Sequence, residues 1–234
     1  MIEPYLQCVI PSCGKTYDVL ESVNFCSCGN LLDVRYSGLE KGILSAPKKA
    51  KSIFKQRLNH KGNIFNESGV WRFRDFIPFY LADKRDYHEV LVSLDGDEGK
   101  TKPFHLTTVA QYVDLKPENL WLQNEGRNPT KSFKDNGMAA AYTHAKMRGA
   151  RATLCASTGN TSASAAAYAA NEGIKAYVLI GEGKIAIGKL AKALEYGAKM
   201  LQLKGGDFDD AMEHISKISN QLPNRRKRRG MSKI

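Results

Sequence analysis

The residues of this chain best suited to chemistry are one lysine and one polar turn. Lys134 ends the run Asn128-Pro129-Thr130-Lys131-Ser132-Phe133-Lys134, and the turn reads Ser157-Thr158-Gly159-Asn160-Thr161. A lysine amine that burial or a neighbouring cation keeps unprotonated can form a Schiff base with an aldehyde. Backbone N–H groups and hydroxyls at a helix N-terminus bind anions. Together they are what an enzyme needs to hold an aldehyde and to orient an anionic substrate.

The elements that must position these residues alternate between strand and helix. Apolar runs predict strands at 120–123, 152–157, 175–180 and 199–203, and helices are expected at 132–148, 161–171, 185–196 and 207–222. Glycines follow three of these helices, at positions 149, 173 and 197, where they favour helix termination. Strands of continuous apolar character between helices indicate a parallel sheet covered on both faces. The fold class expected is therefore α/β, with a doubly wound and mostly parallel sheet.

The motif around Lys134 resembles Asn-Pro-Thr-Gly-Ser-Phe-Lys-Asp of the threonine synthase family, which belongs to the pyridoxal phosphate (PLP) enzymes similar to tryptophan synthase β. The segment Gly69-Val70-Trp71-Arg72-Phe73 looks like a Gly-Val-Trp-Arg-Tyr segment of the same family. The resemblance implies a fold of the PLP type II kind. It also implies conversion of O-phosphohomoserine and water to threonine and phosphate.

The resemblance also assigns roles, position by position. It implies that Lys134 carries PLP as a Schiff base and moves protons, and that Asn160 lies beside the PLP ring oxygen. Substrate carboxylate or phosphate would be bound by Ser157, Thr158, Thr161 and Lys189, with Lys184 as a competitor for the role of Lys189.

The chain departs from the family pattern at two positions and matches it loosely at a third place. Lys131 stands where the family usually has glycine, and Asn136 replaces a common arginine. The segment 98–103 resembles Glu-Gly-x-Thr-Pro-Leu with an extra lysine, and a solvated loop is the alternative interpretation.

Four of the five cysteines form two close pairs near the start of the chain. The pairs are Cys8-x4-Cys13 and Cys26-x-Cys28, each beside a glycine that permits a tight turn. Paired cysteines in a cytosolic chain suggest zinc more than disulfides, and four thiolates complete a closed tetrahedral site. We expect a zinc-ribbon-like module with structural zinc, and reduced thiols in a ribbon that has lost its metal are the alternative.

Composition and charge limit the partners. The 234 residues are 42% hydrophobic and carry a net charge of +11, six units of which lie in the last ten residues. A basic run at a chain end is usually a solvated tail, and a nucleic-acid or acidic-surface contact is the alternative. The sequence shows neither a transmembrane stretch nor a signal peptide, so we expect a cytoplasmic protein without a membrane partner. An assembly of identical chains is left open.

The expected organisation has four parts. These are a cysteine-rich zinc-ribbon-like module at 1–38, a connector and packing segment at 39–95, a partial PLP-binding α/β core at 96–222 and a basic tail at 223–234. Enzymes of the family continue well beyond the position that corresponds to the end of this chain. We therefore expect a C-terminally truncated form with an exposed apolar sheet edge and poor solubility.

Two other functions are kept open. One is a different PLP lyase or β-replacement enzyme on the same fold, such as a cysteate synthase or a threonine dehydratase. The other is a non-catalytic binding protein built from a zinc ribbon, a relic core and a basic tail.

Overall fold

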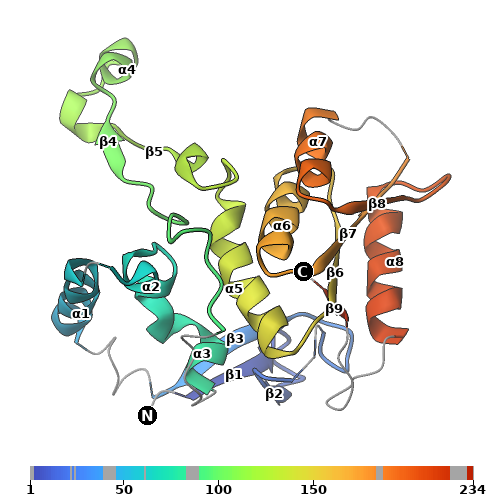
Figure 1. Cartoon of the computed structure of the whole chain (residues 1–234). Helices are drawn as coiled ribbons and strands as arrows, with labels where there is room; N and C mark the ends of the chain where they lie inside the picture. The colour runs from blue at the N-terminus through green and yellow to red at the C-terminus, as the bar shows by residue number, and fades with distance from the viewer. Residues whose placement is uncertain are drawn as a thin grey trace. The chain divides into compact units, whose positions relative to one another are not determined.

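The computed structural model describes residues 3–21, 23, 25–38, 46–60, 62–82, 90–182, 187–221 and 231–233 (Figure 1). The chain divides into two compact units. The first contains residues 1–67 and 71–91, and the second contains residues 68–70 and 92–234. Among the described helices, none combines the length and the apolar character that crossing a bilayer requires.

The first unit combines a small antiparallel sheet with short helices. Its strands are β1 (Glu3–Cys8), β2 (Thr16–Asp18) and β3 (Leu32–Ser37), in the order β2-β1-β3. Its helices are α1 (Pro47–Asn59), α2 (Ile64–Glu67), the 3-10 helix η3 (Trp71–Phe76) and α3 (Pro78–Ala82). Pro47 suits the first turn of α1 because it has no N–H group to leave unpaired.

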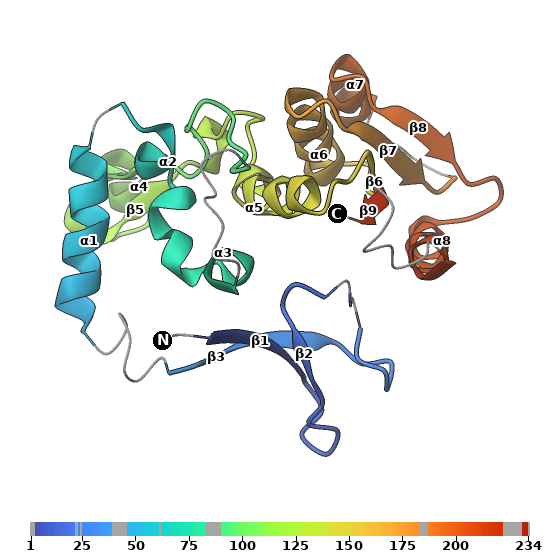
Figure 2. The ribbon, with the colours of Figure 1, turned by 60° about the horizontal axis from the view of Figure 1, so that its bottom comes forward.

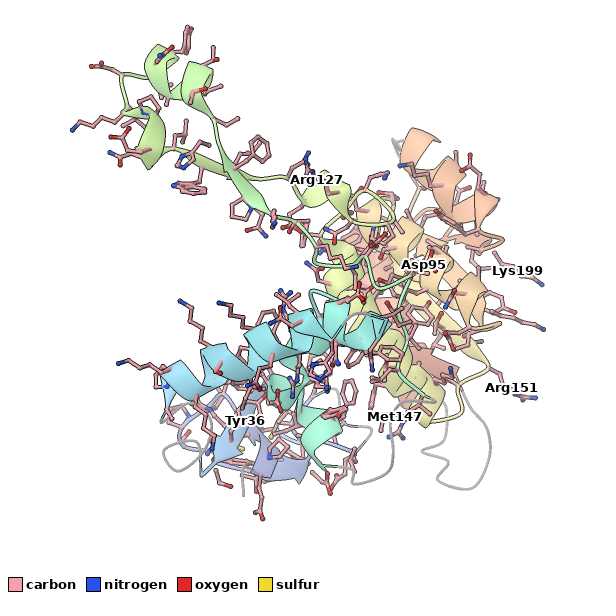
Figure 3. All side chains as sticks on the ribbon, turned by 60° about the vertical axis from the view of Figure 1, so that its left-hand side comes forward. Tyr36, Asp95, Arg127, Met147, Arg151 and Lys199 are labelled. Atoms are coloured by element: carbon pink, nitrogen blue, oxygen red, sulfur yellow. The ribbon has the colours of Figure 1, made fainter. Side chains whose placement is uncertain are left out.

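Aromatic packing and one ion pair hold the helices of the first unit together. The ring of Phe54 in α1 lies 4.8 Å from that of Phe73 and 5.7 Å from that of Phe76. Arg57 in α1 binds Asp75 through both terminal guanidinium nitrogens. The hydroxyl of Tyr36, labelled in Figure 3, donates to the carbonyl of Phe76 and so connects the sheet to η3.

The second unit begins with an arm of short elements. The arm consists of β4 (Pro103–His105), α4 (Thr107–Tyr112), the 3-10 helix η5 (Pro117–Asn119) and β5 (Trp121–Gln123). Figure 3 shows it extending away from the rest of this unit, with Arg127 of η6 (Glu125–Arg127) near its base. Strands β4 and β5 pair with each other in antiparallel orientation. The strand expected at 120–123 therefore exists but does not belong to the parallel sheet, because its partner is the nearby segment 103–105.

The remainder of the second unit is a β/α sandwich that follows the predicted alternation. After α5 (Lys134–Met147) come β6 (Ala152–Ala156), α6 (Asn160–Asn171), β7 (Lys175–Ile180), α7 (Ile187–Glu195), β8 (Lys199–Gln202) and α8 (Phe208–Gln221). Strand β9 (Met231–Lys233) completes an all-parallel sheet in the order β8-β7-β6-β9. Figures 1 and 2 show α6 and α7 on one face of the sheet and α8 on the other.

The two faces of this sheet are packed differently. On the α8 side, Leu154 and Leu179 pack against Ala211 and Ile215. On the other side α6 is rich in alanine, and all eight residues from Ser162 to Ala169 are buried. These small side chains let neighbouring backbones approach closely. The predicted parallel sheet with helices on both faces is confirmed for β6, β7 and β8, whereas β9 was not predicted.

The end of the chain differs in one respect from the expected solvated tail. Residues 231–233 form β9 and pair with Ala152–Leu154 of β6. A polar segment can do this at a sheet edge because ladder hydrogen bonds satisfy its backbone whatever its side chains are. The basic run at 225–229 lies outside the described residues.

Candidate active site

The loop before α5 has a defined conformation that ends at Lys134. The N–H of Lys131 donates to the carbonyl of Asn128 at 2.8 Å, which closes a turn around Pro129. The N–H of Lys134 donates to the hydroxyl of Ser132 at 3.2 Å, and Lys134 is the first residue of α5. Its side chain is half-buried, with the ammonium nitrogen 4.6 Å from the ring centroid of Phe133. The loop therefore presents a partly sheltered amine at a helix N-terminus.

A buried carboxylate lies directly after this lysine. Asp135 has no exposed surface, and it accepts hydrogen bonds from the N–H of Thr130 at 2.7 Å and from the Thr130 hydroxyl at 2.6 Å. It accepts a third from the hydroxyl of Ser164 in α6 at 2.5 Å. Asp135 thus joins the lysine loop to the neighbouring helix.

The polar turn lies where β6 ends and α6 begins. The N–H of Gly159 donates to the hydroxyl of Ser157 at 3.1 Å, and the hydroxyl of Ser162 donates to the carbonyl of Gly159 at 2.7 Å. Among the described residues no side chain caps the N-terminus of α6, and Asn160 is exposed. The first N–H groups of the helix therefore keep their capacity to bind an anion.

A hydrogen bond between Ser164 and Asp135 links the helix that follows the polar turn to the helix that begins with Lys134. Asn160 and Ser164 are four residues apart in α6, so they share a face of the helix. Because Ser164 binds Asp135, that face is turned toward the start of α5. Lys134 and Asn160 accordingly belong to adjoining helix N-termini, with Ser157, Thr158 and Thr161 flanking Asn160 in the chain.

The second lysine predicted for the site lies in a neighbouring helix. Lys189 is the third residue of α7, and its side chain is outside the described part of the chain. Its competitor Lys184 lies outside the described residues altogether.

The start of the lysine loop is also held by hydrogen bonds among Asn128, Glu125 and Thr101, which the sequence patterns did not predict. Asn128 is fully buried; its side-chain oxygen accepts from the N–H of Gly99 at 2.8 Å, and its amide donates to Glu125 at 2.8 Å. Glu125 also accepts from Thr101 at 2.9 Å. Burial opposes ionisation of Glu125, but hydrogen bonds from Thr101, Asn128, Gln123 and Asn136 together lower its pKa.

Glu98 is a second buried carboxylate of this unit. It is fully buried and accepts from Ser68 at 2.5 Å and from Ser93 at 2.8 Å. The solvated-loop interpretation of this segment is therefore wrong at Glu98 and at Thr101, which is 6% exposed. In the sequence, this burial was indicated only by the spacing of Glu98 and Thr101, which resembles that of the family segment.

The four paired cysteines converge in the first unit. The sulfur atoms of Cys8, Cys13, Cys26 and Cys28 all lie within 4.8 Å of one another, with Cys8–Cys28 and Cys13–Cys26 separations of 3.6 Å. Gly14 and Gly29 adopt φ angles of 58° and 84°, which let the chain turn sharply after each pair. The backbone of Cys28 and the Tyr17 hydroxyl lower the pKa of Cys26 to about 6. The four sulfur atoms lie close enough together to hold one metal ion.

Comparison with known proteins places this chemistry in a family. A family model described as "Pyridoxal-phosphate dependent enzyme" matches residues 94–229. The threonine synthase of Methanocaldococcus jannaschii is 40% identical over 209 residues, which are 89% of this chain and 46% of that protein. The threonine synthase of Mycobacterium leprae is 60% identical over 102 residues, or 44% of this chain and 28% of that protein.

A third relative agrees with these two. The threonine synthase of Synechocystis sp. is 44% identical over 159 residues, or 67% of this chain and 40% of that protein. The chain thus spans less than half the length of each of these curated relatives. The family match covers the lysine loop, the polar turn and strands β6, β7 and β8, and the chain therefore belongs to the pyridoxal-phosphate dependent enzymes.

Proposed function

We propose that this chain carries the lysine-bearing part of a threonine synthase, which converts O-phosphohomoserine and water to threonine and phosphate. The observation that carries the proposal is the hydrogen bond from Ser164 to Asp135, because it links the start of α5, where Lys134 lies, to the helix that follows the polar turn. The similarity to three threonine synthases supports this choice among the reactions of the family.

The residues present fit PLP by the chemistry of their donors. A primary amine can form a Schiff base with an aldehyde, and N–H and hydroxyl groups at a helix N-terminus can bind oxyanions. When bound, PLP supplies the aldehyde and a ring that stores the electron pair released at the substrate α carbon. In this proposal Lys134 holds the cofactor and Asn160 orients its ring through the ring oxygen.

The same residues would then serve the substrate. The Nζ atom of Lys134 would take the proton from the α carbon of O-phosphohomoserine and would move protons at the β carbon. The hydroxyls of Ser157, Thr158 and Thr161 bind the substrate's carboxylate or phosphate oxygens, and Lys189 adds a positive charge. Phosphate leaves from the γ carbon, and water adds at the β carbon.

We also propose that the cysteine cluster binds one structural zinc ion. Four thiolates at about 2.3 Å from a tetrahedral ion lie about 3.8 Å apart, and the Cys8–Cys28 and Cys13–Cys26 sulfur separations are both 3.6 Å. The cluster lies at the ends of β1 and β3 in the first unit, whose described residues include few buried apolar side chains. On this view the metal stabilises a zinc-ribbon-like module and takes no part in the reaction.

The test of the enzyme proposal is capture of PLP. The purified chain is incubated with PLP, reduced with borohydride and digested, and the modified lysine is located by mass spectrometry. We expect the label on Lys134 in the native chain and its loss in Lys134→Ala, while Lys131→Ala keeps it. Label spread over exposed lysines, or unchanged in Lys134→Ala, contradicts the proposal for this chain.

Substrate choice is tested separately in a full-length enzyme that contains this segment. Release of phosphate from O-phosphohomoserine with formation of threonine is expected. A preference for phosphoserine with sulfite would instead assign a cysteate synthase, and deamination of threonine would assign a dehydratase.

A further inference from the structure

The carboxylate of Asp135 is buried and accepts three hydrogen bonds next to the proposed cofactor lysine. It is fully buried, yet it follows Lys134 directly in the chain and has no place in the proposed reaction. Three donors lie within 2.7 Å of its oxygens, two from Thr130 and one from Ser164. Hydrogen bonds to an ionised acceptor are shorter and stronger than those between neutral groups.

The donors of Asp135 come from two different elements. Thr130 belongs to the turn that starts the lysine loop, and Ser164 belongs to the second turn of α6. One carboxylate therefore fixes the beginning of the loop and the neighbouring helix at once. The backbone of Lys134 lies between Thr130 and Asp135 in the chain, so these bonds restrain its position relative to α6.

We propose that Asp135 is a positioning residue, which acts through Thr130 and Ser164 to hold the amine of Lys134 at the N-terminal turn of α6. This inference rests on the proposed function, because the position of Lys134 matters for catalysis only if Lys134 holds the cofactor. It names the residue that keeps Lys134 close to the residues proposed to bind the cofactor and the substrate. Asp135 itself touches neither.

A purely structural role makes a different prediction. If Asp135 only stabilised the fold, any change that destabilised α5 to the same extent would have the same effect on the lysine loop. Thr143 offers this comparison. It is fully buried in the same helix, accepts from the N–H of Val92 at 2.8 Å and donates to the carbonyl of Ala139 at 2.9 Å, away from the loop.

The first measurement is amide hydrogen exchange at Lys131 and Lys134. Their N–H groups bind Asn128 and Ser132, not Asp135, so they report the order of the loop and not the loss of one bond. In Asp135→Asn and Thr130→Val we expect exchange roughly 10- to 100-fold faster at both amides. Thr130→Ser, which keeps the hydroxyl, and Thr143→Val should leave both amides near the native rate.

The second measurement is the ratio of PLP label on Lys134 to that on Lys131 after borohydride reduction. We expect this ratio to fall about tenfold in Asp135→Asn and in Ser164→Ala, and to be unchanged in Thr130→Ser and Thr143→Val. Exchange rates and label ratios in Asp135→Asn equal to the native values would overturn the inference. So would an equal response in Thr143→Val.

The two proposals can fail separately. If the native chain puts no preferential label on Lys134 while exchange responds as expected, the positioning of the loop stands and the cofactor function of this chain fails. If the native chain labels Lys134 and Asp135→Asn labels it equally well, the function stands and the positioning inference is overturned.

Discussion

The N–H of Lys131 donates to the carbonyl of Asn128 at 2.8 Å, and Lys131 completes this turn with a φ angle of 66°. That left-handed conformation costs a residue with a Cβ atom roughly 1–2 kcal/mol, whereas glycine adopts it freely. The threonine synthase pattern has glycine at this position. The structure therefore keeps the turn that the glycine would make and holds a lysine in it under strain.

Lys131→Gly should raise the free energy of unfolding by about 1 kcal/mol, because it removes this strain. Urea unfolding measures the change. Lys131→Ala is the control, since it removes the charge but keeps the Cβ atom, and it should bring no such gain. An equal gain in both variants would show that charge, and not the backbone, was responsible.

Gly69→Ala should destabilise the second unit by about 3 kcal/mol, as overpacked sites do. A Cβ atom at Gly69 would lie 2.2 Å from the carbonyl carbon and oxygen of Gly99, and a backbone cannot move aside as a flexible side chain can. Gly137→Ala is the matched control. A Cβ atom there meets nothing within 4 Å and the residue lies inside α5, so a gain of about 0.5–1 kcal/mol is expected. Similar losses in both variants would contradict the close approach of Gly69 and Gly99.

Glu98 should make the stability of the second unit depend on pH. Burial raises the pKa of Glu98, and hydrogen bonds from Ser68 and Ser93 offset only part of the effect. The folded state therefore holds the proton more tightly than the unfolded chain does. The contribution of this group to stability is complete below the ordinary carboxyl pKa and is lost as the pH rises through the folded-state pKa.

Glu98→Gln tests this directly, because its side chain cannot titrate. The free energy of unfolding is measured in urea from a pH just below the ordinary carboxyl pKa to neutrality. In this variant it should no longer show the decrease with pH that Glu98 causes in the native chain. Glu118→Gln, at an exposed position, should keep the native profile. A native profile in Glu98→Gln would contradict the assignment to Glu98.

Removal of the proposed zinc ion should unfold the first unit. Zinc binding to four thiolates contributes about 10–16 kcal/mol to the folding of small modules. This exceeds the net free energy of unfolding expected for a small unit without its metal. We expect one zinc ion per chain by elemental analysis, and its loss in Cys13→Ser and in Cys28→Ser. Cys155→Ala should keep the metal, because Cys155 is buried in β6 of the other unit. A metal-free native chain with an intact β1–β3 sheet would contradict the zinc proposal.

The alternation of strands and helices from 132 to 221 was predictable from the sequence alone. Apolar runs mark β6, β7 and β8, and glycines 149, 173 and 197 follow α5, α6 and α7 with φ angles of 65°, 64° and 79°. These features depend on residues that are neighbours in the chain, so local sequence is enough to define them. Cys155 lies within the apolar run of β6 and is buried, as such a run indicates.

Only the tertiary structure decided which distant groups meet. Asp135 could not be told from an ordinary acidic residue at a helix N-terminus until Ser164 was placed beside it, and Glu98 could not be told from a solvated residue until Ser68 was. The partner of β5 and the position of β9 beside β6 were likewise decided by tertiary contacts. Local sequence sets backbone preferences over a few residues, whereas pairing across the chain depends on which surfaces exclude water together. The reactive residue types and their spacing were thus legible in the sequence, and the carboxylate that joins them was not.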